Sequence, residues 1–359
     1  MMITRLGGAV SLALIILSNG WTPSSSSAAS VQDFYKGKTV KIVIGSRPGG
    51  SYGLYALLTS RHLGKFVPGS PTVIMESRPG AGGLVALNYL GTVAPRDGTV
   101  MTVAQVTIVQ EGMFNKRAKY DPSKFRFIGR LGGLQILLMA SKQSGIKSLE
   151  DARNRDVAVG AAGSFNFTAQ LPQTLNRLTG TRFKVTAGYQ GTGESFLALE
   201  RGEVDVAATS LDTLRARHWS KVTSGKLVPI AVYARERLAG FPMVPTVGEF
   251  GRTDIDKAFL KIFTVGTEIG RSLAFPPGVP EARLAAVRAA YEKMIVDPAF
   301  QADAKKVKLK LMPASGEKLD RIVSDTLNIP SGTIAKARVF YNGLRKGIVK
   351  KKRKKKKKK

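Results

Sequence analysis

Between Lys38 and Leu90 the chain twice repeats an apolar run, a glycine-rich turn and a segment with helical spacing. The first unit pairs a predicted strand over 38–45 (KTVKIVIG) with a helix over 54–63, and the second pairs 72–76 with 84–90. Strands that alternate with helices favour a mostly parallel sheet covered by helices. The chain is therefore expected to be α/β.

A second set of strands and helices follows, and 359 residues suffice for two lobes with a core in each. We expect two lobes with a mixed, mainly parallel sheet in each. Lobe 1 would comprise residues 31–135 and 236–342, and lobe 2 residues 136–235. The remaining apolar patterns predict strands over 99–104, 134–140, 156–160, 183–187, 204–208, 226–233 and 263–266, and helices over 168–178, 195–201, 281–295 and 316–327.

The first thirty residues have the pattern of a signal peptide. Arg5 precedes a twelve-residue apolar run over 6–17, which is too short to span a bilayer, and small residues follow it. We expect cleavage near Ala29 or Ser30 and export to the periplasm. A buried core helix is the alternative interpretation of the same run.

Four glycine turns stand where predicted strands lead into helices. Such a turn exposes backbone N–H groups at the positive end of a helix dipole, a combination that binds anions. Turns of parallel strands meet at one sheet edge, so donors from both lobes would converge on one anionic ligand. The turns are Gly49-Gly50-Ser51, Gly80-Ala81-Gly82-Gly83, Gly163-Ser164 and Gly191-Thr192-Gly193.

Other chemistries have weaker support in the sequence. There is no cysteine and no P-loop, and the two histidines are far apart, which argues against thiolate or histidine-based metal sites. An enzyme remains an alternative, because Gly49-Gly50-Ser51-Tyr52-Gly53 fits the nucleophile-elbow pattern GxSxG. Ser51 would then need His218 and an acid such as Asp205 or Asp212.

The formal net charge of +31 indicates a preference for anionic partners. Twelve of the fifteen residues from Arg345 to Lys359 are Lys or Arg, and we expect residues 343–359 to form a disordered tail. A second functional hypothesis is therefore an exported polyanion-binding protein that acts through its basic body and tail. Adenine-rich read-through would explain the lysine run without any function.

Several ordered motifs resemble the substrate-binding proteins of tripartite tricarboxylate transporters, the Bug family. They are RPGGSYGLYA, SRPGAGGLVALNYL, APRDGT, GYQGTGESFLALERGEVDV, PMVPTVGEF and FPPGVPEARLAAVRAAYEKMIVDPAF, within a match from about Val31 to about Arg338. The resemblance implies a two-lobed Venus-flytrap fold of periplasmic-binding-protein type II. It also implies no enzyme activity, no cofactor or metal, a small organic acid as ligand and transporter subunits as partners. We expect a monomer without specific nucleic-acid binding.

The resemblance also extends the candidate site. In the family, turns matching 49–52, 80–83, 163–166 and 191–193 line the cleft, which adds Tyr52 and Asn166, and an acid matching Asp205 stands near it. The sequence departs from the family at Gly53 and Leu57, where Asp and Arg are common. These positions are four apart on a helix, so the family residues would pair there. Their joint absence suggests that a structural pair was lost.

Overall fold

The computed structural model describes residues 26–164, 166–234, 237–344 and 348–350. Most of the predicted signal peptide and of the lysine-rich tail lies outside these residues. Within the described part of the chain, no helix is long and apolar enough to cross a membrane. Val349 and Lys350, inside the segment predicted to be disordered, form the short strand β12 (Val349–Lys350).

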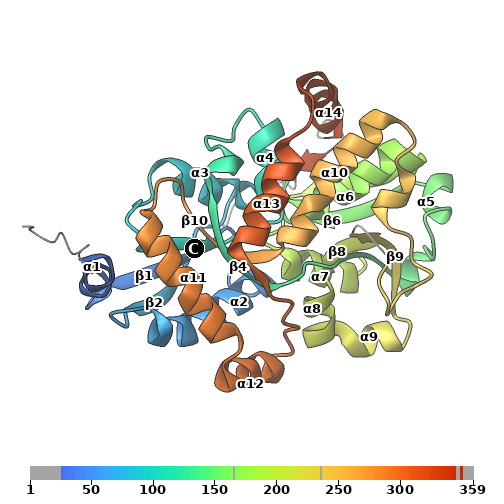
Figure 1. The fold of residues 1–359 in the computed structure, drawn as a ribbon. Coiled ribbons are helices and arrows are strands. Elements are labelled where there is room, and N and C mark those ends of the chain that lie inside the picture. Colours follow the sequence, from blue (N-terminus) through green and yellow to red (C-terminus); the bar gives the residue numbers. More distant parts are fainter. Residues whose placement is uncertain (1–25, 165, 235–236, 345–347, 351–359) are drawn as a thin grey trace, which may run out of the picture.

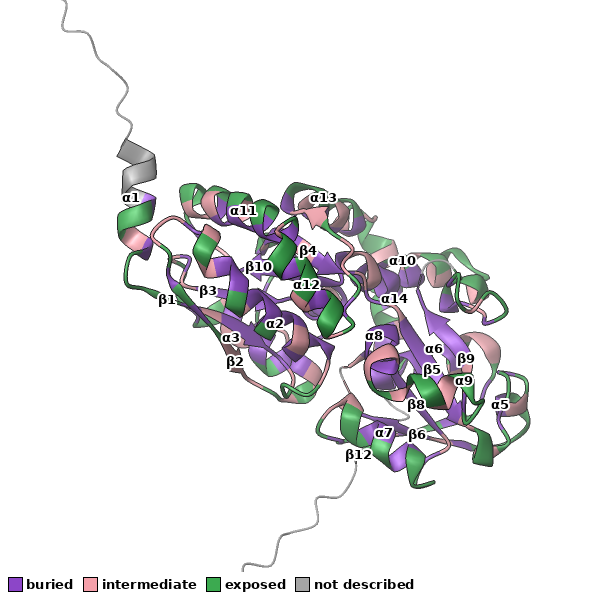
Figure 2. Cartoon of the chain, turned by 90° about the horizontal axis from the view of Figure 1, so that it is seen from below, coloured by how far each residue is buried: buried purple, intermediate pink, exposed green. Residues whose placement is uncertain are grey.

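The chain forms two lobes, each built on a six-stranded mixed sheet (Figures 1 and 2). In the first sheet β1 pairs in parallel with β2 and β3, whereas β10 pairs antiparallel with β3 and β4. The order is β11-β4-β10-β3-β1-β2. Its strands are β1 (Thr39–Ile44), β2 (Thr72–Ser77), β3 (Val100–Val103), β4 (Arg126–Gly132), β10 (Arg271–Phe275) and β11 (Ala314–Ser315).

The second sheet has the order β12-β7-β6-β8-β5-β9. β6 pairs in parallel with β7 and β8, and β12 extends the sheet in parallel with β7. β5 runs antiparallel to β8 and β9. The remaining strands are β5 (Ile136–Ser141), β6 (Val157–Ala161), β7 (Phe183–Ala187), β8 (Val206–Ser210) and β9 (Leu227–Tyr233).

Helices cover both sheets, as alternating strands and helices predict. α2 packs on β1 and β2, α11 and α13 pack on β4, and α6 and α7 pack on β6. Helices of the first lobe are α1 (Ser26–Tyr35), α2 (Ser51–His62), α3 (Leu84–Thr92), α4 (Ile108–Phe114), α11 (Glu281–Ile295), α12 (Pro298–Lys306) and α13 (Gly316–Leu327). Those of the second are α5 (Asp151–Asn154), α6 (Phe167–Thr179), α7 (Thr192–Glu200), α8 (Leu211–Thr213) and α9 (Trp219–Thr223).

Two further helices join the lobes. α10 (Asp254–Ile269) packs against α4, α13 and α14, and α14 (Ser331–Leu344) packs against α4 of the first lobe and α6 of the second. One hydrophobic cluster runs through this junction and contains buried residues of both sheets, such as Val43 and Val159. Each lobe also has a smaller core of its own. The junction therefore packs the two lobes against each other through a shared hydrophobic core.

The strand predicted over 263–266 is wrong, because these residues lie inside α10. Thr253 and Asp256 form a capping box at the start of this helix, and Phe259 stacks on Phe263 one turn later with ring centroids 5.2 Å apart. A four-residue apolar run has no length or period that separates a buried strand from a buried helix. The capping box was the local signal that identifies the helix.

Candidate functional site

The four glycine turns lie at the carboxyl ends of parallel strands, as predicted. Gly49-Gly50 follows β1 and Gly80–Gly83 follows β2 in the first sheet. Gly163 follows β6 and Gly191 follows β7 in the second. Because the two sheets direct these edges toward each other, the turns border the space between the lobes.

The turns of one lobe approach those of the other closely. A Cβ atom added to Gly163 would lie 3.0 Å from the backbone nitrogen of Gly82, so the second and third turns are in contact. A Cβ atom added to Gly50 would lie 3.8 Å from Oγ1 of Thr192, which brings the first and fourth turns together. Ala81, Ser164 and Gly193 stand in these same turns. The structure therefore brings the four predicted turns together in two pairs across the interface between the lobes.

Three helices begin at these turns without a side-chain cap. Gly50, Gly83 and Gly191 are the N-cap residues of α2, α3 and α7, and glycine has no side chain to accept the first free N–H groups. Gly83 has φ +104° and Gly191 φ +141°, conformations that L side chains rarely adopt. The N-terminus of α6 differs, because Oδ1 of Asn166 accepts from the N–H of Thr168. The backbone N–H donors for an anion therefore come mainly from α2 and α7, since at α3 the N–H of Leu84 already donates to the carbonyl of Ala81.

Arg271 is a buried residue of the cleft that the sequence analysis missed. It begins β10 and its side chain is fully buried. Its Nη2 donates to Oγ of Ser51 at 2.8 Å and its Nη1 donates to the carbonyl of Gly133 at 2.8 Å. The guanidinium lies 5.3 Å from the ring centroid of Tyr55. Arg271 thus anchors the first glycine turn to the floor of the first lobe.

Asp212 reaches this arginine from the second lobe. It follows β8 at the carboxyl end, and its Oδ2 lies 3.5 Å from both Nη1 of Arg271 and the hydroxyl of Tyr55. Burial raises the pKa of Asp212, and the nearby charges of Arg271 and Arg215 oppose this rise. The ion pair therefore joins the two lobes at the base of the cleft.

Ser51 and Tyr52 lie at the first turn but are already hydrogen-bonded. Ser51 Oγ accepts from Arg271, and Oη of Tyr52 accepts from the N–H of Val106 at 3.0 Å. Both side chains are buried. Their contacts hold the turn against β3 and β10, so these two residues position the N–H groups of α2.

Asp205 lies away from the turns. It precedes β8, and its carboxylate accepts from the N–H of Ala158 at the amino end of β6. The five-residue strand β8 separates it from the carboxyl edge, a distance of about 16 Å at about 3.3 Å per residue. The family-derived placement of Asp205 beside the turns does not fit this geometry, and the acids found nearer to them are Asp212 and, in the first turn of α7, Glu194.

The elbow hypothesis has no supporting contacts. Nδ1 of His218 lies 3.1 Å from Oε1 of Glu200, so its acidic neighbour is neither Asp205 nor Asp212. Ser51 Oγ contacts Arg271 instead of a histidine. The contacts among the described residues thus do not form the Ser–His–acid series that a hydrolase requires.

The rim of the cleft carries unpaired positive charge. Arg217 lies in a π-helical turn over Leu214–His218, a type of distortion frequent at functional sites. Its Nη1 lies 3.9 Å from the position of a Cβ atom on Gly49, across the lobes. Among the described residues neither Arg217 nor Arg47 has an ion-pair partner. Both arginines attract anions toward the first and fourth turns.

At Gly53 the structure accounts for one half of the departure from the family. A Cβ atom there would lie 2.1 Å from the carbonyl oxygen of Pro48, because the first turn folds back over the helix. Leu57, by contrast, is 36% exposed, so an arginine side chain there can extend into solvent. Glycine is thus required at position 53 by the local path of the chain.

We expect Gly53→Asp to lower the free energy of unfolding by about 1–3 kcal/mol, since the clash involves backbone atoms that must shift. Leu57→Arg should leave the thermal midpoint unchanged, and adding it to Gly53→Asp should restore nothing. Thermal unfolding of the three variants checks this. A Gly53→Asp variant as stable as the unaltered protein would contradict the described path of the first turn.

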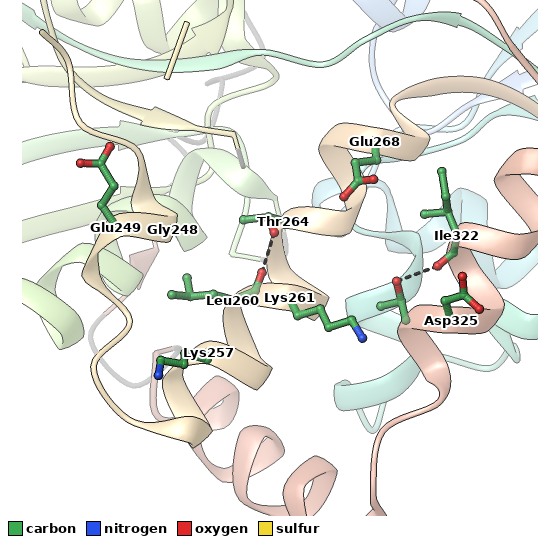
Figure 3. Close-up of a pocket in the computed structure, with 10 residues that line it drawn as sticks. Gly248, Glu249, Lys257, Leu260, Lys261, Thr264, Glu268, Ile322 and Asp325 are labelled. Carbon is green, nitrogen blue, oxygen red and sulfur yellow. Dashed lines mark hydrogen bonds between the residues drawn. The ribbon is translucent and has the colours of Figure 1, made fainter. Parts of the chain in front are cut away.

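A cavity of about 570 Å³ lies outside this cleft, between α10 and α13. Figure 3 shows that both helices contribute charged side chains, among them Lys261 and Asp325. Thr264 and Thr326 donate their hydroxyls to backbone carbonyls of their own helices. None of the predicted site residues lines this cavity.

Comparisons with known proteins agree with this architecture. The family model described as "Tripartite tricarboxylate transporter family receptor" matches residues 63–339. The UPF0065 protein in the gbd 5′ region of Cupriavidus necator is 30% identical over 234 residues, covering 62% of this chain and 68% of the relative. Protein BugT of Bordetella pertussis is 25% identical over 228 residues, covering 61% and 68%.

Solved structures share the fold. The periplasmic binding protein BugD matches with a TM-score of 0.65 and 19% identity, covering 88% of this chain and all of that protein. MatC from Rhodopseudomonas palustris with bound malate matches with a TM-score of 0.62 and 22% identity, covering 84% and 99%. Rpa4515 of the same organism, with adipate, matches with a TM-score of 0.62 and 17% identity, covering 84% and 97%. The two-lobed α/β fold is therefore that of periplasmic binding proteins.

Proposed function

The chain belongs to the tripartite tricarboxylate transporter receptor family, and we propose that it captures a small carboxylate-bearing metabolite between its lobes. It then delivers this ligand to a membrane transporter of the tripartite tricarboxylate type. The protein acts in the periplasm after removal of residues 1–30, as a monomer and without a cofactor. The carboxylate lies at the helix N-termini that border the cleft.

One observation carries the proposal. Three helix N-termini without a side-chain cap, on α2, α3 and α7, lie at the interface between the lobes and come from both of them. α2 and α7 offer N–H donors and a positive dipole end, whereas at α3 the N–H of Leu84 already donates to the carbonyl of Ala81 and the helix contributes mainly its dipole. The unpaired charges of Arg47 and Arg217 add long-range attraction. Two solved structures that share the fold hold malate and adipate, which supports small dicarboxylates as first candidates.

A thermal-shift screen tests this function. Malate and adipate come first, followed by a broad set of small mono- and dicarboxylates, with neutral sugars as the control. An acid at 100 times its dissociation constant should add about 2.7 kcal/mol to the stability of the folded state. Stabilisation by sugars together with no shift by any acid would refute the proposal.

The polyanion-binding hypothesis is tested in the same screen. Heparin should stabilise the protein more than any small acid if the basic surface dominates, and moderate salt should abolish the effect. A carboxylate receptor behaves differently, because binding inside a closed cleft is much less sensitive to screening. The response to heparin and the effect of salt on it thus distinguish a polyanion-binding protein from a carboxylate receptor.

A further inference from the structure

Gln105 is a buried amide at the carboxyl edge of the first sheet. It follows β3, and only 2% of its surface is exposed. Its Nε2 lies 2.9 Å from the position of a Cβ atom on Gly45 and 3.4 Å from that on Gly83. The side chain therefore lies between the end of β1 and the second glycine turn, where neither neighbour has room for a side chain.

The amide nitrogen of Gln105 has no hydrogen-bond partner among the described residues. Leaving a buried donor unpaired is destabilising, and such exceptions in folded proteins call for a reason. Here the donor lies beside Gly83, the uncapped N-terminus of the nine-residue helix α3. An unpaired side-chain donor and the positive end of a helix dipole thus lie at the same place.

We propose that Gln105 is a ligand-contacting residue that determines specificity, and that its Nε2 donates a hydrogen bond to a carboxylate oxygen held at the N-terminus of α3. The inference rests on the proposed function and deepens it. A neutral amide adds a donor without adding charge, so the first lobe fixes the orientation of the acid group. The two arginines at the rim supply attraction but lie by the other pair of turns.

A purely structural role makes a different prediction. If Gln105 only fills the space between Gly45 and Gly83, then methionine, which has a similar length and shape, should replace it without effect on binding. A structural hydrogen bond would instead make any loss of affinity follow a loss of stability. The two roles are therefore separated by measuring both quantities on the same variants.

The experiment is calorimetric titration of Gln105→Met with malate, or with adipate if malate gives no heat with the unaltered protein. Affinity should fall at least tenfold, the usual effect of losing a hydrogen bond to a charged group. The thermal midpoint without acid should stay equal or rise, because the variant removes an unpaired buried donor. Gln105→Glu should weaken binding at least a hundredfold through charge repulsion.

Gln170→Met is the matched control. Gln170 is equally buried, but its Nε2 donates to Oε1 of Glu111 at 2.7 Å and to Oη of Tyr341 at 3.0 Å. This variant should lower the thermal midpoint and leave acid affinity within about twofold. The two glutamines thus have opposite expected effects on stability and on binding.

The proposal is overturned if Gln105→Met binds malate or adipate as tightly as the unaltered protein. It is also overturned if this variant is unfolded or loses stability in parallel with affinity. If the unaltered protein binds neither these acids nor any other acid of the screen, the proposed function fails first. This failure is seen with the unaltered protein before any variant is measured, so it can be told apart from a failure of the proposal on Gln105.

Discussion

Replacing Gly193 by aspartate should weaken acid binding by about three orders of magnitude and leave the protein folded. Gly193 is the second residue of α7, is exposed, and has open space where a Cβ atom would lie. The new carboxylate would accept the free N–H groups of α7 and repel a ligand carboxylate. Two such charges about 4 Å apart repel by about 4 kcal/mol at an effective dielectric of about 20. Calorimetric titration measures the change.

Gly332→Asp controls for the helix effect. Gly332 is the second residue of α14, also with open space at its Cβ position, but lies away from the glycine turns. An acid in the first turn favours helix stability, so both variants should keep or raise the thermal midpoint. Only Gly193→Asp should lose affinity. Equal affinity in a folded Gly193→Asp variant would remove α7 from the site.

Gly82→Asp tests the same cleft from the first lobe. Gly82 has φ +70° and touches Gly163 across the lobes, so a side chain there both repels the acid and obstructs closure. If only one of the two glycine substitutions matters, the ligand is held by a single lobe.

Arg271→Met should lower stability by about 3–5 kcal/mol, which is about 10 °C in the thermal midpoint for a protein of this size. The substitution removes the hydrogen bond to Ser51 at the first turn and the one to the carbonyl of Gly133, and it leaves the buried carboxylate of Asp212 without its arginine partner. Calorimetry or circular dichroism measures the midpoint. Arg153→Met is the control, since Arg153 pairs with Glu150 on the surface and such pairs contribute about 0–1 kcal/mol.

Adding Asp212→Leu to Arg271→Met should restore part of the loss, because the uncompensated charge is then gone. The stability lost in Arg271→Met relative to the unaltered protein should also depend on pH. Burial already raises the pKa of Asp212 above its ordinary value of 3.8, and removing Arg271 raises it further. A carboxyl group whose pKa is raised in the folded state stabilises the fold at pH values below its unfolded pKa of 3.8. This contribution is lost as the pH rises through the pKa of the folded state. The difference in midpoint should therefore be smaller at pH 4.5 than at pH 7.5.

The glycine turns could be predicted because each is local in sequence. A strand, a turn and a helix follow one another within about twenty residues, and the parallel sheet then determines that the turns share an edge. Gln105 could not be identified in this way. Its burial and its missing partner depend on Gly45 and Gly83, which lie on other strand–helix units.

Arg271 was missed because its contacts join segments that are far apart in the sequence. Its contact with Ser51 spans 220 residues, and β10 is a five-residue strand within a region where no strand was predicted at that position. Asp205 and Asp212 illustrate the same limit. Both flank β8, but only the one after the strand reaches the cleft, and strand direction relative to the ligand is a property of the fold.

The two ends of the described chain belong to different lobes. α1 packs against α11 in the first lobe, whereas β12 pairs with Thr186 and Ala187 of β7 in the second. The sequence contains no cysteine, so single cysteines introduced near both ends would be the only thiols available to maleimide dyes. Val349 is 65% exposed and is a suitable second labelling position. A donor–acceptor dye pair at these ends converts lobe movement into a change in energy-transfer efficiency, which turns the protein into an optical sensor for its ligand.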